Sequence, residues 1–154
     1  MRSHQVSSHQ EANQLVNNIR TVDLDFVSRV KEKIIEEWQD IWNNTNTLLR
    51  RLEPTVKQKY ESKNLNRLDT IKSFRLRTGH TNLTHKHLLK GEMAPTCEIC
   101  DELLTVQHFI TVCPAYDIQR QLFGLSASIT ENLKKENLKN TLEYLKSIGL
   151  YDKI

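Results

Sequence analysis

Three cysteines and one histidine form a compact group in the second half of the chain, with the spacing C-x2-C-x7-H-x4-C. They are Cys97, Cys100, His108 and Cys113, and the 154-residue sequence contains no further cysteine. Two thiolates that are separated by two residues on a tight turn can bind one side of a metal ion. A histidine and a third thiolate from the next element can complete a tetrahedron around it. The pattern therefore predicts a zinc site with these four ligands.

The same cysteines are also compatible with two arrangements that hold no metal. Three part-buried free thiols beside an ordinary histidine would need no ion. A disulfide is less favoured, because three cysteines cannot all pair and residues 1–20 are polar, without the apolar stretch of a secretory signal. The chain is therefore expected in a reducing intracellular compartment, where this spacing favours a metal. We expect no nucleophilic cysteine, since no Cys-His-Asx set stands out.

Charge changes sign abruptly just before the predicted zinc site. Residues 70–90 carry five Lys or Arg and no acid, whereas residues 91–119 carry five acids and no Lys or Arg. A carboxylate-free basic segment is typical of phosphate contact, so the segment predicts weak, non-specific binding of RNA or DNA. The predicted nucleic-acid ligands are Lys72, Arg75, Arg77, His80, Lys86 and Lys90. Two alternatives stay open: internal pairing of the cations with the acidic segment, and a turn hydrogen bond for His80.

The elements that must position these residues are predicted to be helices, because the chain has only 4 Gly and 3 Pro. Apolar residues at helical spacing indicate a long amphipathic helix over 23–51 and a second helix over 64–78, which Gly79 ends. Thr84 can cap a short helix that closes at Gly91. A helix starting at Leu103 or Thr105 carries His108 and ends at Cys113, because Pro114 disfavours helix there. Two short helices are predicted over 127–136 and 138–147.

This organisation predicts a mainly α protein: a long amphipathic helix, short helices and a small zinc-stapled unit. Four segments are expected: a polar N-terminal segment (1–21), a helical region with the basic segment (22–91), the CCHC unit (92–123) and a helical tail (124–154). No apolar run approaches the roughly 20 residues of a membrane span, so no membrane association is expected.

Two tryptophans share one face of the long predicted helix, since Trp38 and Trp42 are four residues apart. The favoured interpretation is that they anchor this helix in the core. Two alternatives are a pair of stacking platforms for nucleobases and a docking face for a protein partner.

The segment from Phe74 to Thr81 (F-R-L-R-T-G-H-T), followed by Cys97 to Cys113-Pro114, resembles a known arrangement. It is similar to the C-terminal region of jockey-type non-LTR retrotransposon polyproteins of animals. In those proteins an R-L-R-x-G-H-T signature precedes a C-x2-C…H-x4-C-P motif, downstream of the reverse transcriptase and ribonuclease H domains. The resemblance covers residues 22–123 and implies a nucleic-acid-related origin.

The resemblance does not imply catalysis by this chain. A reverse transcriptase needs an aspartate pair on a strand hairpin, and ribonuclease H needs several carboxylates around Mg²⁺. Residues 10–15 resemble a degraded end of the family's last ribonuclease H helix, with Asn13 in place of the metal-binding aspartate. We therefore expect no catalytic residue in a zinc-binding, nucleic-acid-associated module. The alternatives are a helical protein-interaction module and a truncated ribonuclease H.

Overall fold

The computed structural model describes residues 3–56 and 65–154, except for the side chains of residues 3–9 and 18–23. The chain divides into two compact units, Met1–Asn44 and Thr45–Ile154. Their boundary lies inside the region 22–91 that was expected to form one segment. The protein is mainly α-helical, as predicted, and within the described residues the one β feature is an isolated bridge between Thr96 and Leu103.

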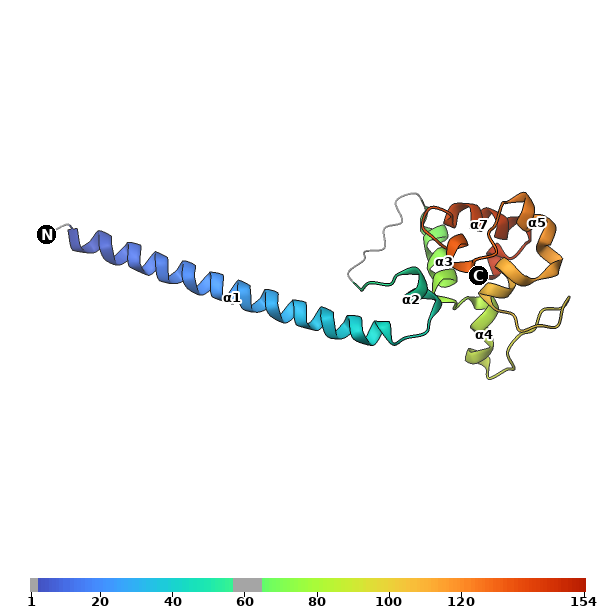
Figure 1. Cartoon of the computed structure of the whole chain (residues 1–154), viewed down its shortest axis with the longest axis horizontal. Coiled ribbons are helices and arrows are strands. Elements are labelled where there is room, and N and C mark those ends of the chain that lie inside the picture. The colour runs from blue at the N-terminus through green and yellow to red at the C-terminus, as the bar shows by residue number, and fades with distance from the viewer. Residues whose placement is uncertain (1–2, 57–64) are drawn as a thin grey trace. The chain divides into compact units, whose positions relative to one another are not determined.

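The first unit is a single helix, α1 (Ser3–Asn43), which Figure 1 shows as one continuous coil. It begins well before the predicted start at residue 23, because no Gly or Pro interrupts the preceding residues. It also ends before the predicted residue 51. The run Asn43–Thr47 explains this early end, since Asn and Thr favour caps over helix interiors. Thr47 is the N-cap of the next helix, where its side chain accepts a hydrogen bond from the Arg50 amide at 3.2 Å.

The second unit begins with three helices, α2 (Leu48–Leu52), α3 (Arg67–Thr78) and α4 (Asn82–Lys90). Gly79 and Gly91 end α3 and α4 in the left-handed conformation, as their positions predicted. The predicted cap of α4 is wrong by one turn. Thr81 is the N-cap, and Thr84 completes a capping box with it from three residues inside the helix. Residues 55–63 are polar, which predicts a loop, and most of them lie outside the described residues.

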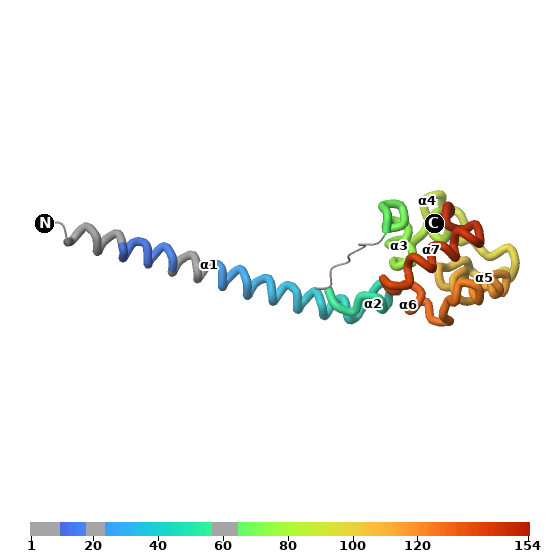
Figure 2. The backbone as a smooth tube through the Cα atoms, turned by 90° about the horizontal axis from the view of Figure 1, so that it is seen from above, coloured from blue at the N-terminus to red at the C-terminus, as the bar shows by residue number. Residues whose placement is uncertain are grey.

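The remaining elements follow the cysteine motif: a π-helical turn η1 (His108–Val112), a 3-10 turn η2 (Pro114–Tyr116), α5 (Asp117–Leu122), α6 (Ile129–Asn132), α7 (Leu138–Ser147) and η3 (Tyr151–Lys153). Helix α7 contacts both α3 and α5, and in Figure 2 α3 to α7 gather into one body. The helix predicted at 138–147 is confirmed, while the one predicted at 127–136 is reduced to the single turn α6.

The core of the second unit joins residues that are far apart in the sequence. Phe109 and Ile110 from η1 pack with Leu76 of α3 and with the buried face of α7. The phenol of Tyr144 in α7 donates a hydrogen bond to the Phe109 carbonyl at 2.7 Å. The buried apolar cluster consists of Leu76, Val106, Phe109, Ile110, Ile129, Leu133, Leu138, Leu142, Tyr144, Leu145, Leu150 and Ile154. Element η1, which carries His108, is therefore anchored directly in the core.

Candidate metal centre

The structure brings the four predicted ligands together. Their ligand atoms all lie within 4.8 Å of one another, and Cys97, His108 and Cys113 are buried. The Sγ atoms of Cys97 and Cys113 are 3.7 Å apart, and Sγ of Cys100 lies 3.3 Å from Nε2 of His108. All three cysteines are free thiols. This arrangement can hold a metal ion.

A short hairpin presents the first two cysteines. Its arms meet at the antiparallel bridge between Thr96 and Leu103. At its tip, the Cys97 amide donates to the Glu102 carbonyl at 2.8 Å, and the Asp101 amide donates to the Cys97 carbonyl at 2.9 Å. Asp101 closes the turn with φ of 57°, a left-handed conformation that Asp tolerates better than most residues. The C-x2-C pair therefore lies on a tight turn, as its spacing predicted.

A π-helical turn presents the other two ligands. Just before this turn, the Thr105 hydroxyl accepts a hydrogen bond from the His108 amide at 3.0 Å. The Cys113 amide then donates to the His108 carbonyl at 2.8 Å, an i→i+5 bond. In an α-helix, residues five apart do not share a face, but this wider turn carries Cys113 round towards His108. Cys113 itself is non-helical, with φ −59° and ψ 120°, which agrees with the predicted effect of Pro114.

The two ends of the cluster differ in their electrostatics. Backbone amides of Ile99 and Cys100 donate towards the Cys97 sulfur and lower the pKa of that thiol to about 6. Burial instead raises the pKa of the Cys113 thiol to about 11. Cys97 therefore favours the thiolate at neutral pH, whereas Cys113 needs a nearby positive charge to lose its proton. A bound cation would supply that charge.

Two residues outside the motif support it, and the motif itself did not point to either. Arg120 of α5 is buried, donates to the Cys113 carbonyl at 2.6 Å and pairs with Asp117. Tyr116 lines a cavity together with Cys97, and its pKa is raised by burial and by the charges of Cys113 and Cys97. One sequence signal could have identified Arg120: it is the first basic residue after the acidic stretch, three positions from Asp117.

Three of the predicted nucleic-acid ligands make contacts inside the protein. Lys72 donates from Nζ to the Tyr151 carbonyl at 2.5 Å, and Arg75 donates to the Ile154 carbonyl at 2.9 Å. Arg77 is only 2% exposed and pairs with Glu53 at 2.5 Å. A guanidinium that is buried in this way cannot reach a phosphate, so the structure removes Arg77 from the predicted surface. Internal pairing was the alternative role of these cations, but the three partners lie outside the acidic segment that was expected to supply them.

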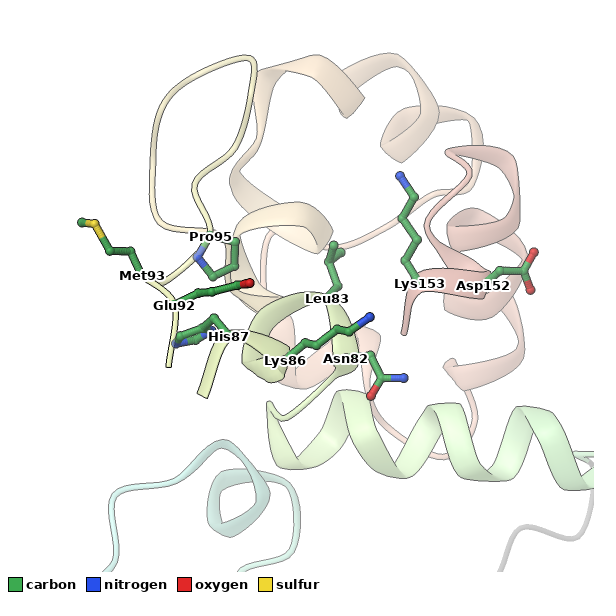
Figure 3. A pocket seen from close by; sticks show the side chains of 9 residues that line it. All are labelled: Asn82, Leu83, Lys86, His87, Glu92, Met93, Pro95, Asp152 and Lys153. Carbon is green, nitrogen blue, oxygen red and sulfur yellow. The ribbon is translucent and has the colours of Figure 1, made fainter. Parts of the chain in front are cut away.

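The remaining three predicted ligands are exposed. His80 Nδ1 lies 2.9 Å from the Thr78 carbonyl, which matches the turn hydrogen bond that was its alternative role. Lys90 forms a loose ion pair with Glu92 at 3.4 Å. Lys86 lines a cleft of about 420 Å³ together with Lys153 and His87. Figure 3 shows Lys86 and Lys153 on different elements of this cleft, with the Asp152 carboxylate directed away from Lys86.

Several further predicted features lie on α1. Trp38 was expected in the core, but it is 56% exposed, while Trp42 is half-buried. This expectation is therefore wrong for Trp38. Glu11 and Asn13, the residues that resemble a ribonuclease H remnant, are exposed on the same helix.

In the described part of the chain, the Cys/His group is the one cluster of metal-ligating side chains, so His80, His85 and His87 do not form another.

Comparisons with family models, with curated proteins and with solved structures found no match. Within residues 3–56 and 65–154, no helix combines the length and the apolar character that crossing a membrane requires.

Proposed function

We propose that this chain is a non-catalytic, zinc-binding, nucleic-acid-associated module. It would correspond to the C-terminal region of the jockey-type retrotransposon polyproteins that its motifs resemble. The observation that carries the proposal is the convergence of three thiols and one imidazole within 4.8 Å. Three sulfur donors and one nitrogen donor are a set that zinc prefers, and magnesium and calcium do not.

Two of the six distances between ligand atoms in the cluster are close to those around a tetrahedral zinc ion. With Zn–S near 2.3 Å and Zn–N near 2.0–2.1 Å, a tetrahedron has S–S edges of about 3.8 Å and S–N edges of about 3.6 Å. The corresponding separations are 3.7 Å between Cys97 and Cys113 and 3.3 Å between Cys100 and His108. The ligand set then has four protein donors and no open position, which is typical of structural rather than catalytic zinc.

The position of the cluster supports a structural role for the metal. Cys97 and Cys100 belong to a hairpin whose two bridge residues, Thr96 and Leu103, are both exposed. His108, in contrast, belongs to η1, whose Phe109 and Ile110 lie in the core. A zinc ion would fasten this exposed hairpin to the core, and its binding energy would contribute to folding.

Nucleic acid is expected to bind outside the metal unit, because three thiolates around Zn²⁺ leave that site with a net negative charge. The exposed candidates are Lys86, Lys90 and His80, and Lys153 extends them across the cleft in Figure 3. Few contacts imply weak binding without strong sequence preference.

The zinc part is tested by elemental analysis of protein purified under reducing conditions. We expect one zinc per chain, and loss of that zinc together with loosening of residues 92–120 in Cys100→Ser. His80→Gln is the matched control, because it removes a histidine outside the cluster and should keep the metal. Wild-type protein without stoichiometric zinc would refute the proposal.

The nucleic-acid part is tested by titrating single-stranded RNA and DNA at several salt concentrations. We expect Lys86→Ala with Lys90→Ala to weaken binding. The slope of log affinity against log salt concentration should become shallower by roughly 0.7–0.9 for each phosphate contact that is lost. Lys134→Ala with Lys139→Ala, which removes two other exposed lysines of the same unit, is the control. No binding at low salt, or equal effects of both pairs, would contradict the nucleic-acid role.

A protein-interaction function is the second candidate, and the exposure of Trp38 favours it. In that case the Trp38/Trp42 face of α1 would contact a partner. Its binding would be insensitive to salt and lost on Trp38→Ala.

A further inference from the structure

Helix α1 carries an apolar stripe that the described residues of the protein leave exposed. We define the α1 stripe as Val27, Val30, Ile34, Trp38 and Ile41, whose exposed fractions range from 40% to 66%. Long helices gain most of their stability by burying an amphipathic face, and contiguous exposed apolar surface marks an interaction site. The stripe is therefore suited to contact another molecule.

The spacing of the stripe keeps it straight along the helix. Its steps are three, four, four and three residues, so Val27 and Trp38 are eleven residues apart, as are Val30 and Ile41. An eleven-residue repeat has 3.67 residues per turn, close to the 3.6 of an undistorted α-helix. A second straight helix can therefore follow the whole stripe.

The sizes of the stripe residues indicate an antiparallel second copy as the partner. In an antiparallel pair centred on Ile34, the numbers of two residues that face each other add up to 68. Val27 then faces Ile41 of the second copy, Val30 faces Trp38 of the second copy, and Ile34 meets itself. The bulky Trp38 is thus opposed by a small β-branched residue, which permits close interdigitation.

The charges beside the stripe favour the same arrangement. Residues 29–33 contain Arg29, Lys31, Lys33 and Glu32, a net charge of +2, whereas residues 35–39 contain Glu36 and Glu37, a net charge of −2. Parallel helices in register would place each segment beside its own copy, so that like charges meet. The antiparallel pair centred on Ile34 places residues 29–33 against residues 35–39 of the second copy.

One charge pair follows specifically from this geometry. Lys33 and Glu37 are four residues apart, so they flank the same edge of the stripe. In an antiparallel pair each edge meets the same edge of the second copy. Lys33 therefore approaches Glu37 of the second copy, and the two-fold symmetry repeats the contact. From these observations we infer that α1 pairs with α1 of a second copy of this chain, antiparallel and centred on Ile34.

The inference is tested by sedimentation velocity of the full chain over about a hundredfold range of concentration. We expect a reversible monomer–dimer equilibrium. Ile34→Gln should raise the dimer dissociation constant by roughly 100-fold, because the symmetric contact loses two buried side chains. Ser28→Gln introduces the same residue away from the stripe and should leave the constant unchanged. A monomer at every concentration, or equal effects of both variants, would overturn the inference.

The orientation is tested by exchanging charges. Lys33→Glu and Glu37→Lys should each weaken the dimer, and the two together should restore it. Failure of the double variant to restore the dimer would overturn the antiparallel geometry. A dimer that forms only with added RNA would also overturn the inference, because the stripe alone should suffice. Zinc content and helicity are measured in each variant, so that loss of folding is not mistaken for loss of pairing.

Discussion

For Arg77 the sequence and the structure indicate opposite roles, because its sequence context indicated phosphate contact and the structure places it in the interior. Its side chain is 2% exposed and pairs at 2.5 Å with Glu53, which is 13% exposed. We consider Arg77→Met, which keeps a long, unbranched side chain and removes the guanidinium. The expected result is a loss of stability with little change in nucleic-acid affinity.

The size of the expected loss of stability follows from the environment of the Glu53 carboxylate, which remains in Arg77→Met. Removing one partner of a buried ion pair costs about 3–5 kcal/mol, because the other charge is left uncompensated. Glu53 keeps some exposure and has Lys135 at 3.8 Å, so the lower end, about 3 kcal/mol, applies. For a unit of about 110 residues this is a fall in Tm of about 12 °C.

The assay is a double-mutant cycle in urea on zinc-loaded protein. Glu53→Leu should cost at least as much as Arg77→Met, because Arg77 is the more buried partner. The double variant should recover most of the loss, since an apolar pair of similar volume replaces the ion pair. Lys139→Met, at an exposed position of α7, is the control. If Arg77→Met is as stable as the wild type and binds RNA less tightly, the reasoning is refuted.

Three further predictions concern the metal unit, the core and catalysis. Arg120→Met should lower zinc affinity by roughly 10–100-fold without removing a ligand, because Arg120 holds the Cys113 carbonyl; competition with a chelator measures this. Burial raises the pKa of Tyr144 to about 12, so its contribution to stability should be complete below pH 10 and lost as the pH rises from 10 towards 12. Tyr144→Phe should flatten that part of the urea-stability profile, and an unchanged slope would count against it. Finally, the pure chain should cleave no RNA–DNA hybrid in Mg²⁺ or Mn²⁺, and cleavage abolished by mutating one carboxylate would restore the enzyme interpretation.

Local sequence signals were sufficient to predict many helix ends and the four side chains that could bind a metal ion. Gly79 and Gly91 end their helices, because glycine adopts the left-handed conformation without steric cost. Pro114 predicted the end of the helical turn at Cys113 for a different reason, because its ring disfavours helical backbone at the preceding residue. The bounds of α1 were predicted less well, since helix termination in an Asn- and Thr-rich run depends on small differences in propensity.

The sequence by itself determined which side chains could bind a metal, because ligand type and spacing along a hairpin and a turn are local properties. Only the tertiary structure decided which basic residues remain available to a partner. Lys72, Arg75 and Lys86 look alike in the sequence, yet the first two donate to carbonyls near residue 154 and the third faces a cleft. Burial depends on contacts between residues far apart in the chain, such as Arg77 and Glu53, and no local pattern specifies those contacts.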